Sequence, residues 1–350
     1  MKNKHNNLDN WSAVHYDMVK ESFDYFGIDN SLIHSIMNRW GEKHRFYHGY
    51  DHLIFILDKI RDRFVRDTVL SRILTAAAVF HDAVYEIEKT DNEDQSAELF
   101  MSLATKNIVN AKKVRAIIMD SKHDVEPSFD LSSVFCEYDL WNIKFGTLSD
   151  LIENEEKIFK EYQRFDYTDY ISGRRAIMKK IGEKTSNPNF KPYLDYLESK
   201  KINIGVYPGS FNPFHVGHMN ILEKAEKIFD KVIVAVGKNT AKVYASPDII
   251  ALDSQKEIKK ALNFRQVDSY TGLLTDYLKS KKYDCTIIRG IRNGTDLEYE
   301  HTQMTYLKKI KDDISVVYIP CDTEFEHVSS SGIRQLSSLD QNEANKYLIL

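Results

Sequence analysis

The sequence predicts two domains, an all-α domain followed by an α/β domain built on a parallel sheet. Its 350 residues are too many for one ordinary domain and suggest roughly two. Apolar residues in the first half recur at intervals of three and four, which is typical of helices with one buried face. In the second half, short β-branched runs alternate with helical segments, which indicates a parallel sheet covered on both faces. We therefore expect an all-α domain over residues 1–182, a linker over 183–201 and an α/β domain over 202–350.

The helices expected in the first half lie over amphipathic stretches. They are Leu53–Arg63, Leu70–Phe80, Ser96–Ala104, Ala111–Met119 and Leu151–Phe165. This half contains one proline, Pro127, whereas the other six lie at Pro188 or later. The polar segment Glu183–Pro192 marks the linker, and a short helix over Tyr193–Lys200 is expected to follow it.

The second half is predicted as alternating strands and helices. The expected strands are Ile202–Tyr207, Lys231–Gly237, Gln266–Ser269, Cys285–Arg289 and Ser315–Ile319. The expected helices are His218–Phe229, Gln255–Leu262, Leu273–Lys281 and Asp296–Ile310. This order predicts a Rossmann-like sheet with helices on both faces.

Composition and charge exclude several functional classes. Lysine and arginine number 48 and aspartate and glutamate 52, so the formal charge is −4, unlike that of a strongly basic nucleic-acid-binding protein. The cysteines Cys136, Cys285 and Cys321 form no CxxC pair, so neither a zinc knuckle nor a disulfide framework is expected. The first residues lack the apolar core of a signal peptide, and no apolar run approaches the roughly 20 residues of a membrane span. We expect a cytoplasmic protein that binds neither nucleic acid nor membranes.

Histidines and an aspartate in the first half form the beginning of a candidate metal site. His48 and His52 stand four residues apart, which on a helix places both on one face; two surface histidines are the alternative interpretation. His81 and Asp82 follow a small, apolar stretch that has the character of a buried helix. A buried imidazole and carboxylate cost several kcal/mol unless a partner such as a divalent cation compensates them.

A second acidic position completes the candidate site. Asp139 stands between Tyr138 and Leu140, and His123 lies between this position and the first group. Mixed imidazole and carboxylate ligands suit a first-row metal or magnesium and leave positions open for water and phosphate. The chemistry indicated is hydrolysis, since such a metal lowers the pKa of bound water and neutralises phosphoryl charge. The candidate ligands are His52, His81, Asp82 and Asp139.

These residues resemble the HD superfamily of metal-dependent phosphohydrolases. The resemblance is carried by YHGYDH over residues 47–52, HDAVY over 81–85 and DNEDQSA over 91–97, the last one residue longer than the usual pattern. Tyr170–Arg174 also matches. The resemblance covers residues 40–182 and implies an HD-type helical domain with a divalent metal (Mn, Fe, Mg, Co or Zn) on the four ligands. It further implies catalytic roles for Asp82 and for His48, the latter as proton donor to the leaving oxygen.

The same resemblance gives provisional roles to four further residues. His123 would hold a second metal or a phosphate. Glu93 would act as a base behind the ligands, or simply as an acid at the start of a surface helix. Arg45 and Arg174 would bind substrate phosphate, with solvated surface arginines as the alternative. The expected substrate is a phosphorylated small molecule, which the sequence does not identify further.

In the second half, the turn after the first expected strand is suited to binding anions. Residues 209–213 read GSFNP, and HVGH follows over residues 215–218 at the start of a helix. A glycine-containing turn between strand and helix exposes backbone N–H groups, and a helix N-terminus favours negative charge. His215 and His218 stand at this point, where His218 can donate hydrogen bonds to a phosphoryl oxygen as charge develops.

Two later motifs point to the same chemistry. RGIR over residues 289–292 ends an expected strand, and ligands gather at the carboxyl ends of strands in such sheets. Its two arginines can bind phosphates. Residues 328–334 read VSSSGIR; hydroxyl and N–H groups at a helix start suit triphosphate oxygens, while a plain helix cap is the alternative.

Together the three motifs resemble the HxGH nucleotidylyltransferases, and most of all the phosphopantetheine adenylyltransferases. The resemblance runs from Ile202 to Leu336 and includes FDKVIVAV, GLLTDYL and RGIRNGTDLEYEHTQM. It implies transfer of adenylate from ATP, bound with Mg²⁺, to 4′-phosphopantetheine, with His218 as a catalytic residue. The residues implied to hold ATP are Ser210, Phe211, His215, His218, Gly290, Ile291, Arg292, Glu300, Phe325, Ser329, Ser330 and Ser331. Those implied to hold phosphopantetheine are Ser210, Lys242, Leu274 and Arg289.

Some positions depart from the family pattern and leave alternatives open. The family usually has Thr where His215 stands and Asp where Asn212 stands, and the Leu-x-x-Arg stretch expected after Lys242 is missing. HVGH and SSSxIR also occur in nicotinamide or nicotinate mononucleotide adenylyltransferases, so the acceptor is phosphopantetheine or a pyridine mononucleotide. The helical half is either an active hydrolase or a module that only binds a nucleotide or partner. Because the transferase family commonly forms hexamers, a homo-oligomer is expected.

Overall fold

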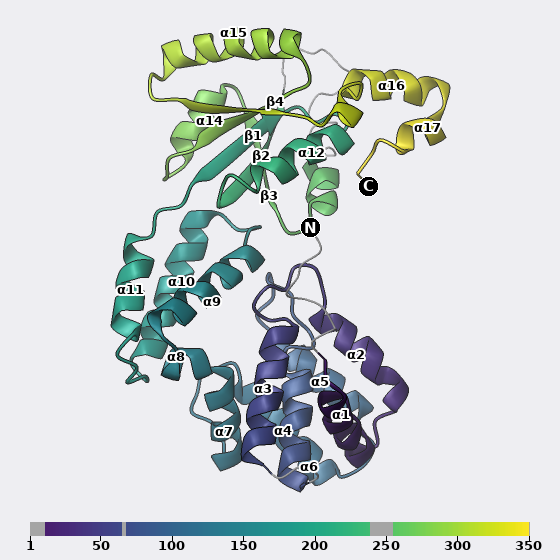
Figure 1. Cartoon of the computed structure of the whole chain (residues 1–350), viewed down its shortest axis with the longest axis vertical. Coiled ribbons are helices and arrows are strands. Elements are labelled where there is room, and N and C mark those ends of the chain that lie inside the picture. Colours follow the sequence, from purple (N-terminus) through teal and green to yellow (C-terminus); the bar gives the residue numbers. More distant parts are fainter. Residues whose placement is uncertain (1–10, 65–67, 239–254, 350) are drawn as a thin grey trace. The chain divides into compact units, whose positions relative to one another are not determined.

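The computed structural model describes residues 11–64, 68–238 and 255–349 (Figure 1). The described residues form two compact units, which fall within Met1–Tyr162 with Arg174–Glu198 and within Gln163–Gly173 with Ser199–Leu350. A helical part followed by a parallel α/β part confirms the expected fold class at that level. Residues 183–201, expected as the linker, contain helix α11 (Phe190–Ser199), nearly all of which belongs to the first unit.

The described residues of the first unit are helical, as their periodicity predicts. Its elements are α1 (Ala13–Phe26), η2 (Asn30–Leu32), α2 (Ile33–Trp40), α3 (Tyr50–Arg63), α4 (Val69–Phe80), α5 (Asn92–Leu103), α6 (Ile108–Asp120), α7 (Asp130–Asp139), α8 (Trp141–Phe145), α9 (Leu148–Glu161) and α11. Helix α10 (Tyr167–Gly182) begins in the second unit and ends in the first.

Helix α4 forms the centre of the first unit. It packs against α1, α3, α5, α6 and α7, and every residue from Ile73 to Phe80 is buried. The three consecutive alanines Ala76–Ala78 keep this helix thin, which lets its neighbours approach closely. Thr68 caps its start by accepting a hydrogen bond from the N–H of Ser71. His81 and Asp82 follow directly after this tightly packed helix, which holds them in place.

The second unit is a five-stranded parallel sheet in the order β3-β2-β1-β4-β5. The strands are β1 (Ile204–Gly209), β2 (Lys231–Lys238), β3 (Gln266–Thr271), β4 (Thr286–Ile291) and β5 (Ser315–Pro320), which confirms all five expected strands. Its helices are α12 (Val216–Ala225), α14 (Leu274–Ser280), α15 (Gly294–Ile310), α16 (Ser330–Leu339) and α17 (Gln341–Asn345), with η3 (Thr323–Phe325) and a helical stretch over residues 255–261.

Alternating side chains of the strands build two separate apolar layers. Val232, Val234 and Val236 of β2 pack with Ile221 and Leu222 of α12. The residues between them, Ile233 and Ala235, face the other way and pack with α14 and α15. Because both faces are covered, the central strands β1 and β2 are apolar along nearly their whole length, whereas the edge strand β3 is largely polar.

A short segment between the two helical stretches α9 and α10 is bound at the base of the sheet. Lys231, the first residue of β2, is buried and donates to the carbonyl oxygens of Gln163 (2.6 Å) and Phe165 (2.8 Å). Asp166 accepts hydrogen bonds from Tyr283 (2.7 Å) and Lys281 (3.1 Å). These contacts explain why Gln163–Gly173 belongs to the second unit. Among the described helices, none combines the length and the apolar character that crossing a membrane requires.

Candidate functional site

In the second unit, the candidate site lies where the order of the strands reverses. β1 and β4 are neighbours in the sheet although β2 and β3 lie between them in the chain. Crossovers leave such a point in opposite directions, so a crevice opens at the carboxyl ends of these two strands. β1 ends at Gly209, directly before the GSFNP turn, and β4 ends at Ile291 within RGIR. Two of the three predicted motifs therefore flank one crevice.

His215 and His218 cap the start of α12 together. The N–H of His218 donates to Nδ1 of His215, and the N–H of His215 donates to Nδ1 of His218, at 3.4 and 3.3 Å. The two rings stack with their centroids 3.6 Å apart. Because both Nδ1 atoms accept hydrogen bonds, the proton of each neutral imidazole lies on Nε2.

The electrostatics of this pair favour the neutral state. Burial and the Arg292 guanidinium lower the pKa of His215 to about 4. Burial, His215 and Arg292 hold the pKa of His218 well below its usual value. At neutral pH, His218 is therefore an uncharged hydrogen-bond donor.

Phe211 supports His218 from within the core. Its side chain is 3% exposed and lies against the His218 ring, edge to face, with centroids 5.0 Å apart. Its φ of 43° is a left-handed conformation that is unusual for an aromatic residue. Gly209 is required nearby, since a Cβ there would lie 2.8 Å from the Phe211 ring. The aromatic ring of Phe211 thus belongs to the apolar core.

The arginines of RGIR are both paired with acids of α15. Arg289 lies 3.1 Å from a carboxylate oxygen of Glu300. Arg292 holds Asp296 through two hydrogen bonds of 2.7 and 3.0 Å. Between the arginines, Gly290 lies so close to α12 that a Cβ would be 2.8 Å from Cγ1 of Ile221. These contacts bring RGIR, Glu300 and the histidine helix to one place.

The serine motif is tied to the GSFNP turn. Ser329 caps α16 by accepting from the N–H of Gly332 at 3.1 Å. Ser330 donates to the carbonyl oxygen of Pro213 at 3.1 Å, and Arg334 donates to that of Asn212. Phe325 approaches Gly217, since a Cβ there would lie 3.9 Å from Phe325. The capping interpretation of Ser329 is therefore correct, and the motif still lies beside the crevice.

The other expected binding residues have different outcomes. Leu274 begins α14, three residues after the carboxyl end of β3, and is buried among α14, α15 and the sheet. Ser210 is exposed, and Ile291 accepts a hydrogen bond from the N–H of Cys321 (2.9 Å) through its carbonyl oxygen. Lys242 lies outside the described residues.

Sequence reasoning missed the contribution of the last residues. The N–H of Val216 donates to the carbonyl oxygen of Tyr347 at 2.9 Å, and His215 forms an antiparallel bridge with Leu348. Tyr347 and Leu348 also pack with Val328 and Ile333 in a small apolar cluster. Backbone pairing of this kind leaves no motif, so only the apolar Tyr-Leu-Ile-Leu ending gave any signal.

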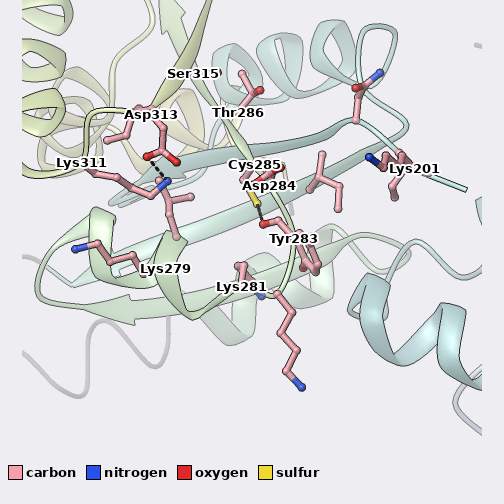
Figure 2. A pocket seen from close by; sticks show the side chains of 16 residues that line it. Lys201, Lys279, Lys281, Tyr283, Asp284, Cys285, Thr286, Lys311, Asp313 and Ser315 are labelled. Atoms are coloured by element: carbon pink, nitrogen blue, oxygen red, sulfur yellow. Dashed lines mark hydrogen bonds and ion pairs between the residues drawn. The ribbon is translucent and has the colours of Figure 1, made fainter. Parts of the chain in front are cut away.

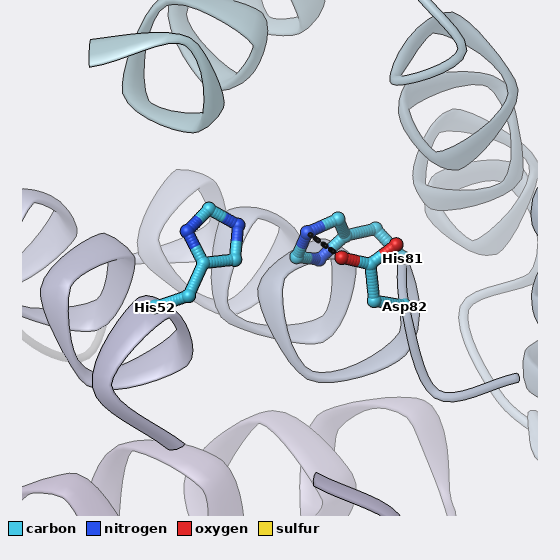
Figure 3. A group of neighbouring side chains, drawn as sticks. All are labelled: His52, His81 and Asp82. Carbon is cyan, nitrogen blue, oxygen red and sulfur yellow. Dashed lines mark ion pairs between the residues drawn. The ribbon is translucent and has the colours of Figure 1, made fainter. Parts of the chain in front are cut away.

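In the first unit, His52, His81 and Asp82 form a compact group of metal-binding donors (Figure 3). One donor atom from each lies within 4.8 Å of the others. The N–H at Nδ1 of His81 donates to the carbonyl oxygen of Ala78 at 2.9 Å, so Nε2 is the ring nitrogen that faces the group. That Nε2 is buried and lies 3.2 Å from a carboxylate oxygen of Asp82 without a well-directed hydrogen bond. A buried imidazole nitrogen that faces a second imidazole and a carboxylate fits a divalent cation.

Asp139 joins the group through its histidine contacts. One carboxylate oxygen lies 3.0 Å from Nε2 of His52 and 3.7 Å from Nε2 of His81. The other lies 2.8 Å from Nε2 of His123. His123 has a φ of 55°, so its backbone adopts the left-handed region at the site. The structure thus brings all four expected ligands and His123 together.

Burial and the neighbouring charges act in opposite directions on the pKa values of this group. Burial opposes the charged form of His81, but Asp82 and Asp139 outweigh it and raise its pKa to about 9. For Asp82 and Asp139, neighbouring histidines outweigh burial and lower the pKa of each carboxyl. Burial, with a further contribution from Asp82, raises the pKa of Glu93.

The expectation that His48 and His52 share a helix is wrong. His48 lies in the loop before α3, which starts at Tyr50 with Gly49 as its cap. The reason is Glu161, whose Oε1 accepts from three consecutive backbone N–H groups, those of Phe46, Tyr47 and His48, at 2.7, 2.7 and 2.9 Å. This carboxylate holds residues 46–48 outside the helix. The rings of His48 and His52 nevertheless lie 6.2 Å apart.

Neither arginine expected to bind phosphate is a solvated surface residue. Arg45 is 1% exposed and donates to the carbonyl oxygen of Asp82 at 2.6 Å, so it fixes the backbone beside the ligands. Arg174 donates to the buried Glu155 at 2.7 Å. No sequence pattern pointed to Glu155 or Glu161, because both lie in an acid-rich helix that resembles an exposed one.

A separate hollow lies at the opposite edge of the sheet (Figure 2). It encloses about 860 Å³ and is bordered by Ile204, Thr286 and Ser315, the first residues of β1, β4 and β5. Among its lysines, Lys311 pairs with Asp313 (2.8 Å), and Lys281 is bonded to Asp268 (2.7 Å). No residue expected for either site lines this hollow.

Comparisons with known proteins concern the second unit. The cytidylyltransferase-like family matches residues 206–336. The phosphopantetheine adenylyltransferase of Syntrophomonas wolfei is 39% identical over 142 residues, which cover 39% of this chain and 85% of the relative. That of Geotalea daltonii is 37% identical over 139 residues, with 40% and 86% covered. A solved structure of a candidate nicotinate-nucleotide adenylyltransferase from Vibrio parahaemolyticus matches with 17% identity and a TM-score of 0.29, covering 39% of this chain and 82% of its own.

Proposed function

Since this chain belongs through residues 206–336 to the cytidylyltransferase-like family, as a homologue of phosphopantetheine adenylyltransferases, we propose that its second unit adenylylates 4′-phosphopantetheine with ATP. The products are dephospho-CoA and pyrophosphate. The observation that supports 4′-phosphopantetheine as the acceptor is the 39% identity with the phosphopantetheine adenylyltransferase of Syntrophomonas wolfei, 85% of which is covered. The convergence of HVGH, RGIR and the serine motif on one crevice supports the reaction type.

The reaction requires alignment and charge stabilisation rather than a covalent enzyme intermediate. An oxygen of the acceptor phosphate attacks the α-phosphorus of ATP, and the bond from that phosphorus to the bridging oxygen breaks as pyrophosphate leaves. The attacking phosphate is already anionic, so no general base is needed. Mg²⁺ enters as part of the nucleotide substrate and offsets charge on the triphosphate.

His218 and the two arginines have defined tasks in this mechanism. His218 donates from Nε2–H to an α-phosphoryl oxygen as negative charge develops in the transition state. Arg292 binds ATP phosphates and Arg289 binds the acceptor phosphate, each exchanging its acid on α15 for a substrate oxygen. The exchange keeps both guanidinium groups paired before and after binding.

An acceptor panel tests this proposal. The full chain with ATP and Mg²⁺ is given 4′-phosphopantetheine, nicotinamide mononucleotide or nicotinate mononucleotide, and pyrophosphate release is measured. We expect release with 4′-phosphopantetheine alone. Pyrophosphate release only with a pyridine mononucleotide would show that 4′-phosphopantetheine is not the acceptor, and would favour the alternative that His215 and Asn212 raised.

The two arginines are expected to bind different substrates. Arg289→Ala should raise the KM for the acceptor, and Arg292→Ala should raise the KM for ATP. Equal effects of both changes on both substrates would contradict these separate roles.

For the first unit, we propose metal-dependent hydrolysis of a phosphate ester. The observation that supports it is the cluster of donor atoms from His52, His81 and Asp82, with Asp139 beside them. These four residues would hold a divalent cation, which when bound supplies an activated water and neutralises phosphoryl charge. His48 would protonate the leaving oxygen, since its imidazole lies beside the group and its Nε2 has no partner among the described residues.

Metal content and hydrolysis test this second proposal separately. Elemental analysis of the purified chain and a screen of phosphate release with added divalent ions are compared for wild type, Asp82→Ala and His48→Ala. We expect Asp82→Ala to lose both metal and hydrolysis, and His48→Ala to keep the metal and lose rate. Adenylyl transfer should survive both changes. Absence of bound metal and of hydrolysis with every ion would favour a module that only binds a nucleotide or partner.

A further inference from the structure

The carboxylate of Glu161 is the meeting point of two sequence motifs of the first unit. It is the last residue of α9 and its side chain has 0% exposure. Oε1 accepts the three N–H groups of Phe46, Tyr47 and His48, and Oε2 accepts from Nδ1 of His48 and from the Tyr85 hydroxyl, both at 2.7 Å. Tyr85 ends the HDAVY motif and His48 belongs to YHGYDH. Five hydrogen bonds thus converge on one buried carboxylate.

This arrangement leaves the His48 ring one orientation. The ring stacks on Tyr85 with centroids 4.5 Å apart and meets the edge of Tyr47 at 4.9 Å. Rotating the ring by half a turn would replace the Nδ1 contact with a carbon and leave a buried oxygen without its donor. An ionised carboxylate only accepts hydrogen bonds, so Nδ1 of His48 carries a proton. Nε2 is then the ring atom that faces away from Glu161, and no described residue binds it.

We propose that Glu161 is a positioning residue for hydrolysis in the first unit: it fixes the tautomer and direction of His48 so that Nε2 delivers a proton to the leaving oxygen. This inference rests on the hydrolysis proposed above. Glu161 touches neither the expected ligands nor the reacting atoms, so it acts through His48. When His48 is protonated at both nitrogens, the carboxylate balances its charge, and when Nε2 has given up its proton, the Nδ1–H bond remains.

Glu161→Gln separates this role from packing. Glutamine has nearly the same volume, and its oxygen can still accept the backbone N–H groups, but its amide nitrogen donates and cannot accept from Nδ1–H. We expect kcat of hydrolysis to fall about 10–100-fold with KM and metal content unchanged. In the His48→Gln background, Glu161→Gln should lower kcat no further, because the residue it positions is already gone.

A matched control lies six residues earlier on the same helix. Glu155 is 1% exposed and accepts from Arg174 and Tyr193, both at 2.7 Å, without contacting His48. Glu155→Gln removes an equivalent buried charge, so loss of stability alone should appear in both variants. Only Glu161→Gln should change the ¹⁵N NMR signals of the His48 imidazole, moving the proton from Nδ1. This readout requires neither substrate nor metal.

The outcomes distinguish this inference from the function on which it rests. If wild type hydrolyses no phosphate ester with any divalent ion, the proposed hydrolysis fails. If wild type is active and Glu161→Gln retains its kcat or its His48 signals, the positioning role is overturned. Tyr85→Phe provides a second variant should Glu161→Gln not fold. It removes one donor to the same oxygen, and we expect a smaller loss of kcat with the Nδ1–H signal retained; a loss of the metal instead would contradict the role.

Discussion

The protonation states of His215 and His218 follow from the contacts that the two side chains make. The reciprocal hydrogen bonds between His215 and His218 place the protons of both rings on Nε2. Burial and Arg292 then keep both rings neutral. The Nε2–H group of His218 is therefore a hydrogen-bond donor whose protonation does not change near neutral pH.

Removing the His218 imidazole should slow adenylyl transfer without loosening ATP. His218→Ala is expected to lower kcat by about 10²–10³, the cost of losing one donor to developing charge. ATP affinity, measured by calorimetry, should change little because the contact strengthens only in the transition state. His34→Ala, an exposed histidine of α2, is the control. A variant with the wild-type rate would show that His218 has another role.

The lowered pKa of His215 predicts how pH acts on this site. With a folded pKa of about 4 and an ordinary value of 6.5, the folded protein resists protonation that the unfolded chain accepts. The contribution to stability is therefore fully present above pH 6.5 and is lost as pH falls toward 4. NMR titration of the His215 ring should show a midpoint near 4. We also expect the two histidines to leave kcat independent of pH between pH 6 and 9. A titration midpoint near 6.5 for the His215 ring would show that burial does not lower its pKa.

At the scale of elements, the crevice depends on how closely α12 approaches β4. Gly290→Ala would place a Cβ 2.8 Å from Cγ1 of Ile221 and push the helix that carries His218 away from the strand. Overpacking of this kind costs about 1–3 kcal/mol, and we expect both the melting temperature and kcat to fall. Gly294→Ala is the matched control, since its Cβ would meet nothing within 4 Å at the start of α15. Equal melting temperatures and rates for the two variants would exclude close packing as the reason for glycine.

The elements that could be predicted are those whose signal is local. All five strands were found because short β-branched runs alternate with helical segments along this half of the chain, although β3 is largely polar. The candidate metal ligands could be selected because each follows or belongs to a motif, and the structure places them together. His48 was placed on a helix wrongly because the residue that pulls it off, Glu161, lies 113 positions away. Arg174 was expected to bind phosphate or to be solvated, because nothing in the sequence shows that Glu155 is buried and accepts its hydrogen bond.

For the whole molecule, the two units alternate along the chain. Lys231 finds its acceptors in Gln163 and Phe165, far from the rest of its unit in sequence. Burial lowers the pKa of Lys231 to about 7, although Asp166 and Asp268 act in the opposite direction. The amine thus depends on a segment that a cut at residue 199 or 202 would remove.

A comparison of the full chain with the fragment 199–350 tests this dependence. Lys231→Met should lower the calorimetric melting temperature of the second unit in the full chain, because two carbonyl oxygens lose their donor, at about 1–3 kcal/mol for a buried unsatisfied group. In the fragment, the same change should have little effect, since the acceptors are already missing. Similar losses in both would show that Lys231 contributes only through its own packing.

The alternation also sets an order of events during synthesis on the ribosome. Residues Gln163–Gly173 leave the exit tunnel before any strand of the sheet that receives them has emerged. Since domains generally fold as they emerge, from the amino-terminal end onward, the first unit must fold without incorporating this segment into its own core. Arg174–Glu198 must join the first unit in the same interval. A short segment of the second unit is thus exposed outside the ribosome, without the sheet that binds it, until β1 and β2 have also emerged.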